Sequence, residues 1–337
     1  MSISSAVFGC LGTGLTEAER GFFKEAAPWG FILFARNIDT PDQVRRLVSD
    51  LRSTVGREAP VLIDQEGGRV ARLRPPHWRA YPPARRYGEI YEKDPEAGRE
   101  AARLGGRLIG CELKALGIDV DCLPLLDVPL PEAHEIIGDR AYSAVPDEIA
   151  QLGRAAAEGL MDAGVLPVIK HIPGHGRALA DSHEHLPVVT TALEELRRTD
   201  FAPFKALADL PIGMTAHVIY EACDSAAPAT LSKTVIDEIV RGEIGFDGLL
   251  MSDDLSMKAL AGSYGERTAG SLAAGCDLVL HCNGEMSEMV GVMDGTSALE
   301  GEALRRAEAV DKFRKAVEPF DEAEAVARFN ALTLQKT

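Results

Sequence analysis

Residues 165–176 read VLPVIKHIPGHG, an apolar run that ends in a lysine and a histidine and continues into a turn of proline and glycine. The run has the length of a buried strand, and its polar residues stand where the strand would end. The same order recurs five times, in IDQEGGR (63–69), LLDVPLP (125–131), TAHVIYEACD (215–224), MSDDLSM (251–257) and LHCNG (280–284). Polar clusters at the ends of so many apolar runs are typical of an α/β fold with one composite site.

Eight short apolar runs alternate with amphipathic helical segments along the chain. We expect strands at residues 6–10, 30–34, 61–65, 118–128, 165–171, 213–217, 248–254 and 277–282. Eight strand–helix units fit a single (β/α)8 barrel, in which the active site forms at the carboxyl ends of the strands. A doubly wound open sheet would also alternate, but it would confine its ligand-binding clusters to the switch point. No linker or low-complexity tract divides the sequence, so we expect one domain over 1–337 with a helical C-terminal segment from about 300.

Two helix starts carry recognisable capping signals. In TPDQVRRLVSDLRS, Thr40 can cap the helix and Gln43 can close a capping box. In TALEELRRTDFAPFKAL, Thr191 and Glu194 have the same spacing. The sequence therefore predicts a capping box at both positions.

The composition excludes several classes of partner. Asp and Glu number 52 against 36 Lys and Arg, which gives a net charge of −16 and argues against a nucleic-acid groove or an anionic membrane surface. We see no secretory signal and no apolar run long enough to span a bilayer. The six cysteines form no CxxC pair, so we expect reduced, mostly buried thiols in a cytoplasmic protein, and we expect a monomer.

The stretch VIKHIPGHGRALADSHEHLPVV contains four of the eight histidines. His171 and His175 are four apart, a zinc-binding spacing on a helix, but Pro173 and the neighbouring glycines disfavour a helix and no Glu follows His171 as in HExxH. We therefore expect neither a metal nor an organic cofactor. For His175 and His185 individually, local hydrogen bonding in a loop is the simpler interpretation.

A proton-transfer pair is the stronger hypothesis for this stretch. Asp181 and His183 are two apart, so in an extended loop both can point the same way. The carboxylate can then fix the imidazole tautomer and leave the other ring nitrogen for proton transfer. No GxSxG elbow supplies a serine nucleophile.

The candidate nucleophile is a carboxylate in GLLMSDDLSM. A carboxylate at a strand end can attack the anomeric carbon of a sugar and form a glycosyl-enzyme. Because neighbours alternate sides on an extended strand, we assign Asp253 to the barrel mouth and Asp254 to capping a helix that begins at Leu255.

Taken together, the motifs KHIPGHG…DSHEHLP, DQEGGRVARL, IGDRAYS and MSDDLSMKAL resemble family 3 of the glycoside hydrolases. More narrowly, they resemble its single-domain bacterial β-N-acetylglucosaminidases that act in cell-wall recycling. The likeness extends from about residues 30–37 to residues 274–283 with the motifs in the same order. It implies a barrel that removes terminal β-linked GlcNAc from a small glycan or muropeptide, without a cofactor.

The resemblance also implies roles for individual residues. Asp253 matches the catalytic nucleophile, and His183 with Asp181 behind it matches an unusual acid/base pair on the loop after the fifth strand. The matching substrate-binding residues are Asp64, Arg72, Arg140, Lys170 and His171. A structural alternative exists for the two arginines, which could be surface salt-bridge residues. A lysine at the polar end of a strand is harder to explain structurally, because a buried lysine requires a partner.

The sequence departs from the family pattern at two positions, since Ile172 and Arg177 stand where Phe and Asp are expected. Neither replaced position has a catalytic role, so the departures concern the shape of the loop. A β-glucosidase, an N-acetylglucosaminide phosphorylase, a barrel aldolase that uses Lys170 and a catalytically inactive sugar-binding protein remain as alternatives.

Overall fold

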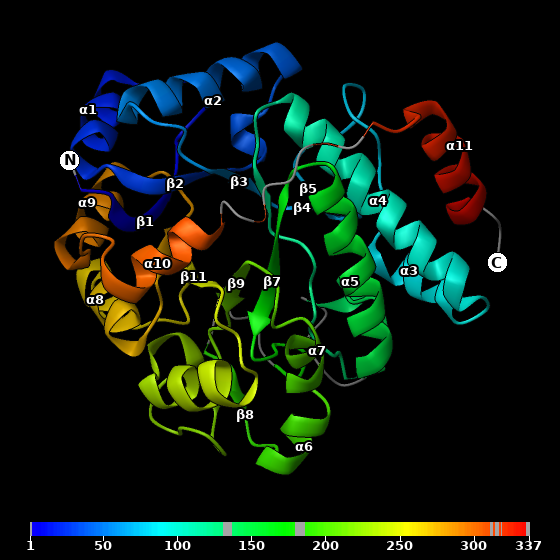
Figure 1. Cartoon of the computed structure of the whole chain (residues 1–337). Coiled ribbons are helices and arrows are strands. Elements are labelled where there is room, and N and C mark those ends of the chain that lie inside the picture. The colour runs from blue at the N-terminus through cyan, green and yellow to red at the C-terminus, as the bar shows by residue number, and fades with distance from the viewer. Residues whose placement is uncertain are drawn as a thin grey trace.

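The computed structural model describes residues 2–130, 137–178, 186–310, 313, 317 and 319–334. Eight parallel strands close into a barrel with the spatial order β1-β12-β11-β9-β7-β6-β3-β2, and helices surround it (Figure 1). The barrel strands are β1 (Ser4–Gly9), β2 (Pro28–Leu33), β3 (Val61–Ile63), β6 (Val120–Asp121), β7 (Leu166–Ile172), β9 (Ile212–Thr215), β11 (Leu249–Asp254) and β12 (Leu278–His281). Each overlaps one of the eight predicted runs, and the (β/α)8 barrel is confirmed.

The predicted strand over 118–128 is shorter in the structure, where β6 covers only Val120–Asp121. Pro124 has no N–H to donate, so a regular ladder cannot pass through it. The chain nevertheless stays beside β7, because Val168 N donates to Leu123 O at 3.0 Å and Leu126 N donates to Lys170 O at 2.8 Å. The polar end of this irregular strand therefore still faces the end of β7.

Two short two-stranded sheets lie outside the barrel. β4 (Gln65–Gly67) and β5 (Val70–Ala71) form an antiparallel hairpin directly after β3, and β8 (Val188–Val189) pairs in parallel with β10 (Ile219–Tyr220). The first of these sheets places the motif that follows Asp64 at the mouth of the barrel.

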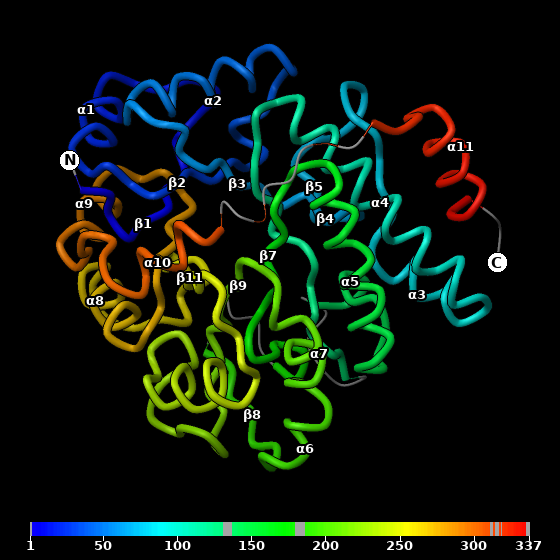
Figure 2. Tube along the Cα trace, viewed as in Figure 1, coloured from blue at the N-terminus to red at the C-terminus, as the bar shows by residue number. Residues whose placement is uncertain are grey.

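The helices fill the connections between strands. They are α1 (Glu17–Ala26), α2 (Pro41–Val55), α3 (Ala84–Tyr91), α4 (Pro95–Ala115), α5 (Pro146–Asp162), α6 (Leu193–Arg198), α7 (Phe201–Ala206), α8 (Tyr264–Ala274), α9 (Met286–Gly295), α10 (Gly301–Val310) and α11 (Glu322–Thr333). Shorter helical turns are η1 (Ala35–Asn37), η2 (Gly138–Arg140), η3 (Ala229–Leu231) and the wide helix η4 (Val235–Glu243). Figure 2 shows α11 near α3 and α4, where Arg328 forms an ion pair with Glu100.

The capping box predicted at Thr40 is wrong in part, and the one predicted at Thr191 is wrong entirely. Thr40 does cap α2, since its hydroxyl accepts from Gln43 N, but the Gln43 side chain accepts from Asp39 N at 2.9 Å rather than from Thr40. Thr191 caps nothing, because α6 begins after Ala192 and has no side-chain cap. The Thr191 hydroxyl instead accepts from Arg177 at 3.5 Å, a partner that a local motif cannot reveal.

The hydrophobic core forms two layers, one inside the barrel and one between the strands and the helices. The inner layer contains Val7, Leu62, Val120, Val168, Ile212, Leu249 and Leu278, each at most 1% exposed. All six cysteines are free, and four of them are buried, as predicted. Within the described ranges, the helices are too short or too polar for any to traverse a bilayer.

Candidate active site

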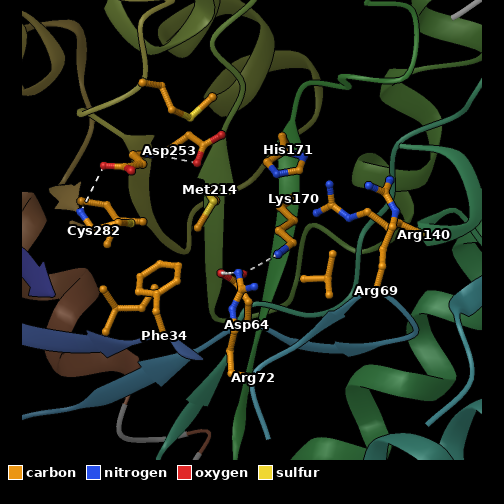
Figure 3. Close-up of a pocket in the computed structure, with 15 residues that line it drawn as sticks. Phe34, Asp64, Arg69, Arg72, Arg140, Lys170, His171, Met214, Asp253 and Cys282 are labelled. Atoms are coloured by element: carbon orange, nitrogen blue, oxygen red, sulfur yellow. Dashed lines mark hydrogen bonds and ion pairs between the residues drawn. The ribbon is translucent and has the colours of Figure 1, made fainter. Parts of the chain in front are cut away.

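A pocket opens at the carboxyl ends of the barrel strands (Figure 3). Six of the eight predicted site residues line it, and they come from five segments of the chain: Asp64, Arg72, Arg140, Lys170, His171 and Asp253. Residues that were not among the predicted site residues complete the wall: Ile32, Phe34, Arg69, Val70, Met214, Asp254, Met257, Leu280 and Cys282. The barrel thus brings together side chains that are up to 250 positions apart in the sequence, from Ile32 to Cys282.

Lys170 is the buried centre of the charged side of the pocket. Its side chain is 2% exposed, and Nζ lies 2.8 Å from Asp64 Oδ1 and 2.6 Å from Glu66 Oε1. Burial by itself would lower the pKa of Lys170, but the two carboxylates outweigh burial and raise it above its usual value. Lys170 therefore stays cationic, which makes it a hydrogen-bond donor and unsuited to the amine chemistry of an aldolase.

The same pairing keeps Asp64 ionised. Burial would raise the pKa of this carboxyl, but Lys170 and Arg72 together hold it well below its usual range. Arg72 NH2 lies 3.0 Å from Asp64 Oδ2, and its guanidinium stacks over the ring of Phe34 at 5.0 Å. A fixed carboxylate flanked by two cations can accept hydrogen bonds from sugar hydroxyls without being protonated itself.

Arg140 is held by Glu66 in a bidentate pair. Its Nε and NH2 donate to the two Glu66 oxygens at 2.8 and 2.7 Å. The side chain of Arg140 is only 11% exposed and that of Arg72 only 23% exposed. Both arginines do form ion pairs, as the structural alternative supposed, but these ion pairs line the pocket rather than the outer surface.

Asp127 orients His171. The buried Asp127 carboxylate accepts from His171 Nδ1 at 2.8 Å and from the backbone N–H groups of His171 and His175 at 3.1 and 2.6 Å. Burial would raise the pKa of Asp127, but the neighbouring His171 lowers it. Because Nδ1 donates to Asp127, Nε2 is the ring nitrogen left for a substrate hydroxyl.

His175 packs behind His171, with the ring centroids 5.6 Å apart. Burial and the neighbouring His171 lower its pKa to about 4, so its ring is neutral at physiological pH. Its backbone bond to Asp127 spans 48 residues, so this contact is not the local hydrogen bond within the loop that the sequence predicted for this position.

Asp253 lies at the end of β11, and Figure 3 shows it across the pocket from Arg69 and Arg140. Its Oδ1 accepts from Asp254 N at 2.8 Å. The prediction that Asp254 caps a helix at Leu255 is wrong, since the next helix is α8, capped by Ser263. Asp254 instead caps a turn, accepting from Ser256 N at 2.9 Å and from Cys282 N at 3.1 Å.

His217, two residues beyond the end of the neighbouring β9, supports this end of β11. Its Nε2 donates to Asp254 O at 3.1 Å, and its Nδ1 lies 2.7 Å from Thr230 Oγ1. Burial lowers the pKa of His217, so the neutral ring can donate from Nε2 and accept at Nδ1. The sequence showed the polar cluster that contains His217 without indicating a role for it.

The predicted acid/base pair lies outside the described residues. Asp181, His183 and His185 all fall in 179–185. Their roles therefore stay predictions. Within the described part of the chain, no group of three or more His, Cys, Asp or Glu side chains is placed to hold a metal ion.

Comparison with known proteins shows the family to which the chain belongs. Residues 15–315 match the N terminal domain of glycosyl hydrolase family 3. The beta-hexosaminidase of Bordetella avium is 40% identical over 276 residues, which cover 81% of this chain and 78% of that protein. The beta-hexosaminidase of Methylococcus capsulatus is 42% identical over 281 residues, which cover 82% of each.

Solved structures agree with the sequence comparison. Native NagZ from Neisseria gonorrhoeae superposes with a TM-score of 0.87 at 31% identity, over 99% of this chain and 98% of that one. The same gonococcal protein in complex with N-trifluoroacetyl-D-glucosamine gives 0.86 at 31% identity, over 99% and 97%. The resemblance seen in the motifs is thus confirmed, and the chain belongs to glycosyl hydrolase family 3 and is a glycoside hydrolase.

Proposed function

We propose that this chain is a retaining exo-β-N-acetylglucosaminidase. It removes terminal β-linked GlcNAc from peptidoglycan fragments, namely GlcNAc-1,6-anhydroMurNAc and its peptides, in the cytoplasm. The beta-hexosaminidase relatives support the activity, and a similar protein binds an N-acylated glucosamine analogue. The observation that carries the proposal is the position of Asp253, a carboxylate at the end of β11 that faces a pocket of fixed sugar-binding charges.

The reaction proceeds by two displacements. In the first, a carboxylate oxygen of Asp253 forms a bond to C1 of the terminal GlcNAc while the bond from C1 to the leaving oxygen breaks. His183, protonated and aimed by Asp181, gives its proton to that oxygen, so the aglycone leaves as a neutral alcohol. In the second, neutral His183 takes a proton from water, whose oxygen attacks C1 and restores the Asp253 carboxylate. Two inversions give net retention.

The charged side of the pocket holds the sugar. Asp64 accepts hydrogen bonds from ring hydroxyls, and Lys170 and Arg72 donate to hydroxyl oxygens on the same face. His171 offers Nε2 to a further hydroxyl. Because these groups are held by one another before substrate arrives, binding energy can be used to distort the ring toward the oxocarbenium-like transition state.

A chromogenic β-GlcNAc glycoside tests the proposal. We expect Asp253→Asn to lose at least about 10³-fold in kcat, because an amide is a far weaker nucleophile than an ionised carboxylate. His183→Ala should lose activity strongly on poor leaving groups and recover much of the first step on good ones. Asp42→Asn, which removes an exposed carboxylate on α2, is the matched control and should hydrolyse at the parental rate.

Stereochemistry and cosubstrate distinguish the proposal from its alternatives. NMR of the first-formed sugar should show the β-anomer, and release of the α-anomer would rule out the mechanism. Product that forms only with inorganic phosphate would indicate a phosphorylase, and preference for a substrate without the acetamido group would indicate a glucosidase. Binding of GlcNAc without turnover would indicate an inactive sugar-binding protein.

A further inference from the structure

The end of β11 that carries Asp253 lies beyond the regular pairing of its strand. The backbone ladder between β9 and β11 ends where Met214 pairs with Met251. On the other side, the stretch from Met251 to Asp254 spans three positions on β11 and two on β12, so one extra residue forms a β-bulge. A bulge bends the strand, changes the direction of a side chain and interrupts the pairing. The direction of Asp253 therefore depends on contacts other than the ladder.

A side chain that follows the neighbouring strand supplies such a contact. His217 follows the last paired residue of β9 by three positions, and Asp254 follows the last paired residue of β11 by three. His217 Nε2 donates to Asp254 O at 3.1 Å, and Asp254 N donates to Asp253 Oδ1 at 2.8 Å. The buried imidazole thus continues the pairing of the two strands where the backbone ladder stops, and it holds the residue that contacts the nucleophile.

Hydrogen bonding fixes the tautomer of this imidazole. A carbonyl oxygen can only accept, so Nε2 of His217 carries a proton, and because burial lowers the pKa of the ring, Nδ1 is left as an acceptor. Thr230 Oγ1 lies 2.7 Å from Nδ1 and gives its single proton to it, since the other available acceptor, Ala216 O, is farther away at 3.1 Å. Thr215 Oγ1 in turn donates to Thr230 at 2.8 Å. The ring is therefore held with its donor directed at Asp254.

We infer that His217 is a positioning residue for the nucleophile and that it fixes Asp253 through the backbone of Asp254. This inference rests on the proposed function and adds a further residue to its mechanism. Among the residues that the structure describes, those that line the pocket include Met214 and Asp253 but not His217. A carboxylate displaced by about 1 Å can lower the rate by about 10²-fold, while the sugar-binding groups keep their positions. The loss therefore appears in kcat and leaves KM nearly unchanged.

Two amide substitutions isolate the contact with Asp254. The side-chain amide of glutamine reaches the place of the imidazole Nε2, whereas the shorter amide of asparagine reaches only the place of Nδ1. His217→Gln can therefore still donate to Asp254 O, and His217→Asn can keep only the contact with Thr230. On a chromogenic β-GlcNAc glycoside, we expect His217→Gln to stay close to the parental kcat and His217→Asn to lose about 10- to 100-fold, with little change in KM for either.

Trapping measures the first displacement by itself and separates misplacement from misfolding. A 5-fluoro glycosyl fluoride of GlcNAc forms a slowly hydrolysed bond to the nucleophile, and mass spectrometry follows both the rate and the final extent of labelling. A misplaced carboxylate lowers the rate, whereas a misfolded fraction lowers the extent. We expect His217→Asn to be labelled fully on Asp253 but about 10- to 100-fold more slowly than the parent.

Ser232→Ala is the matched control for a loss of stability in the same region. Ser232 is buried two positions after Thr230, and its hydroxyl donates to Asp224 at 2.6 Å and accepts from Val235 N at 3.1 Å. Its removal should lower the urea concentration at which the protein unfolds, because it leaves Val235 N and Asp224 with one partner fewer. The contact between His217 and Asp254 stays intact, so kcat and the labelling rate should remain parental.

Equal values of kcat in His217→Gln and His217→Asn would overturn the inference, because the two differ in the contact with Asp254. A loss that appears in KM, or in the extent of labelling at a parental rate, would overturn it too. So would a fall in kcat in Ser232→Ala as large as that in His217→Asn. These outcomes leave the proposed function standing. A parental enzyme that hydrolyses no β-GlcNAc glycoside, or that is labelled on a residue other than Asp253, would refute the proposed function and the inference with it.

Discussion

Asp127 shows how one buried carboxylate can set the chemistry of the residue that touches the sugar. In Asp127→Asn, the amide oxygen can still accept from the backbone N–H groups of His171 and His175. Its NH2 would then face His171 Nδ1, which forces the ring proton to Nε2. The substrate hydroxyl would meet a donor in place of an acceptor, so we expect KM to rise about tenfold with little change in kcat. Steady-state kinetics on a chromogenic β-GlcNAc glycoside measures this.

A double-mutant cycle separates this positioning role from general destabilisation. If Asp127 acts only through His171, then Asp127→Asn should cost little more in a His171→Ala background. Full additivity of the two losses would contradict the assignment.

The site residues that the sequence identified are those that stand inside a motif. Asp64, Lys170 and Asp253 each end an apolar run, so their position at the barrel mouth followed from the pattern. Glu66 stands two positions beyond Asp64, and that spacing on an extended segment was an available signal. Asp127 was recognisable only as part of a polar cluster, because its partner His171 is 44 residues away and meets it through the adjacency of two strands. Long-range pairing of this kind leaves no local trace.

At the scale of elements, the apolar runs predicted every barrel strand. The hydrogen-bond partners of side chains at the ends of helices and strands depended instead on tertiary contacts. The spacing of Thr191 and Glu194 predicted that Thr191 caps a helix, yet the Thr191 hydroxyl accepts a hydrogen bond from Arg177. Asp254 had the position of a helix cap, yet the segment after it forms a turn. Side chains at element ends have several possible partners, and the fold decides among them.

The crossing of α4 and α5 gives a test at this scale. The two helices approach so closely that a Cβ on Gly159 would lie 2.1 Å from the carbonyl oxygen of Arg103. That oxygen belongs to the backbone of α4, so neither helix can yield locally. We expect Gly159→Ala to lower the free energy of unfolding by about 1–3 kcal/mol or more, measured by urea denaturation.

Gly21, in the interior of α1, is the matched control. A Cβ there meets nothing within 4 Å, and glycine in a helix interior carries an entropic cost. Gly21→Ala should therefore stabilise the protein by about 0.5–1 kcal/mol. Equal effects of the two substitutions would show that the α4–α5 approach does not constrain Gly159.

At the scale of the whole molecule, the closed barrel concentrates buried acids at its mouth, and these acids respond to pH in opposite directions. Burial would raise the pKa of Glu66, but Arg140 and Lys170 lower it to about 2. Its contribution to stability is present above the unfolded value and is lost as pH falls toward 2. Burial raises the pKa of Asp121 well above its usual value, with a smaller opposing effect from the N–H of Gln65. Its contribution is present below the unfolded value of about 4 and is lost as pH rises.

Asp121→Asn separates the two responses. The amide copies the shape of the protonated carboxyl and keeps the bond from Gln65 N, but it cannot ionise. In the parent, the unfolded chain ionises Asp121 above about pH 4, while the raised pKa of the buried carboxyl moves its ionisation in the folded protein to higher pH. We therefore expect Asp121→Asn to unfold at higher urea than the parent at pH 7, by a margin that shrinks toward pH 4. A difference between the two proteins that is equal at pH 4 and pH 7 would mean that Asp121 titrates alike in the folded and unfolded chains, and the raised pKa of the buried Asp121 carboxyl would have to be abandoned.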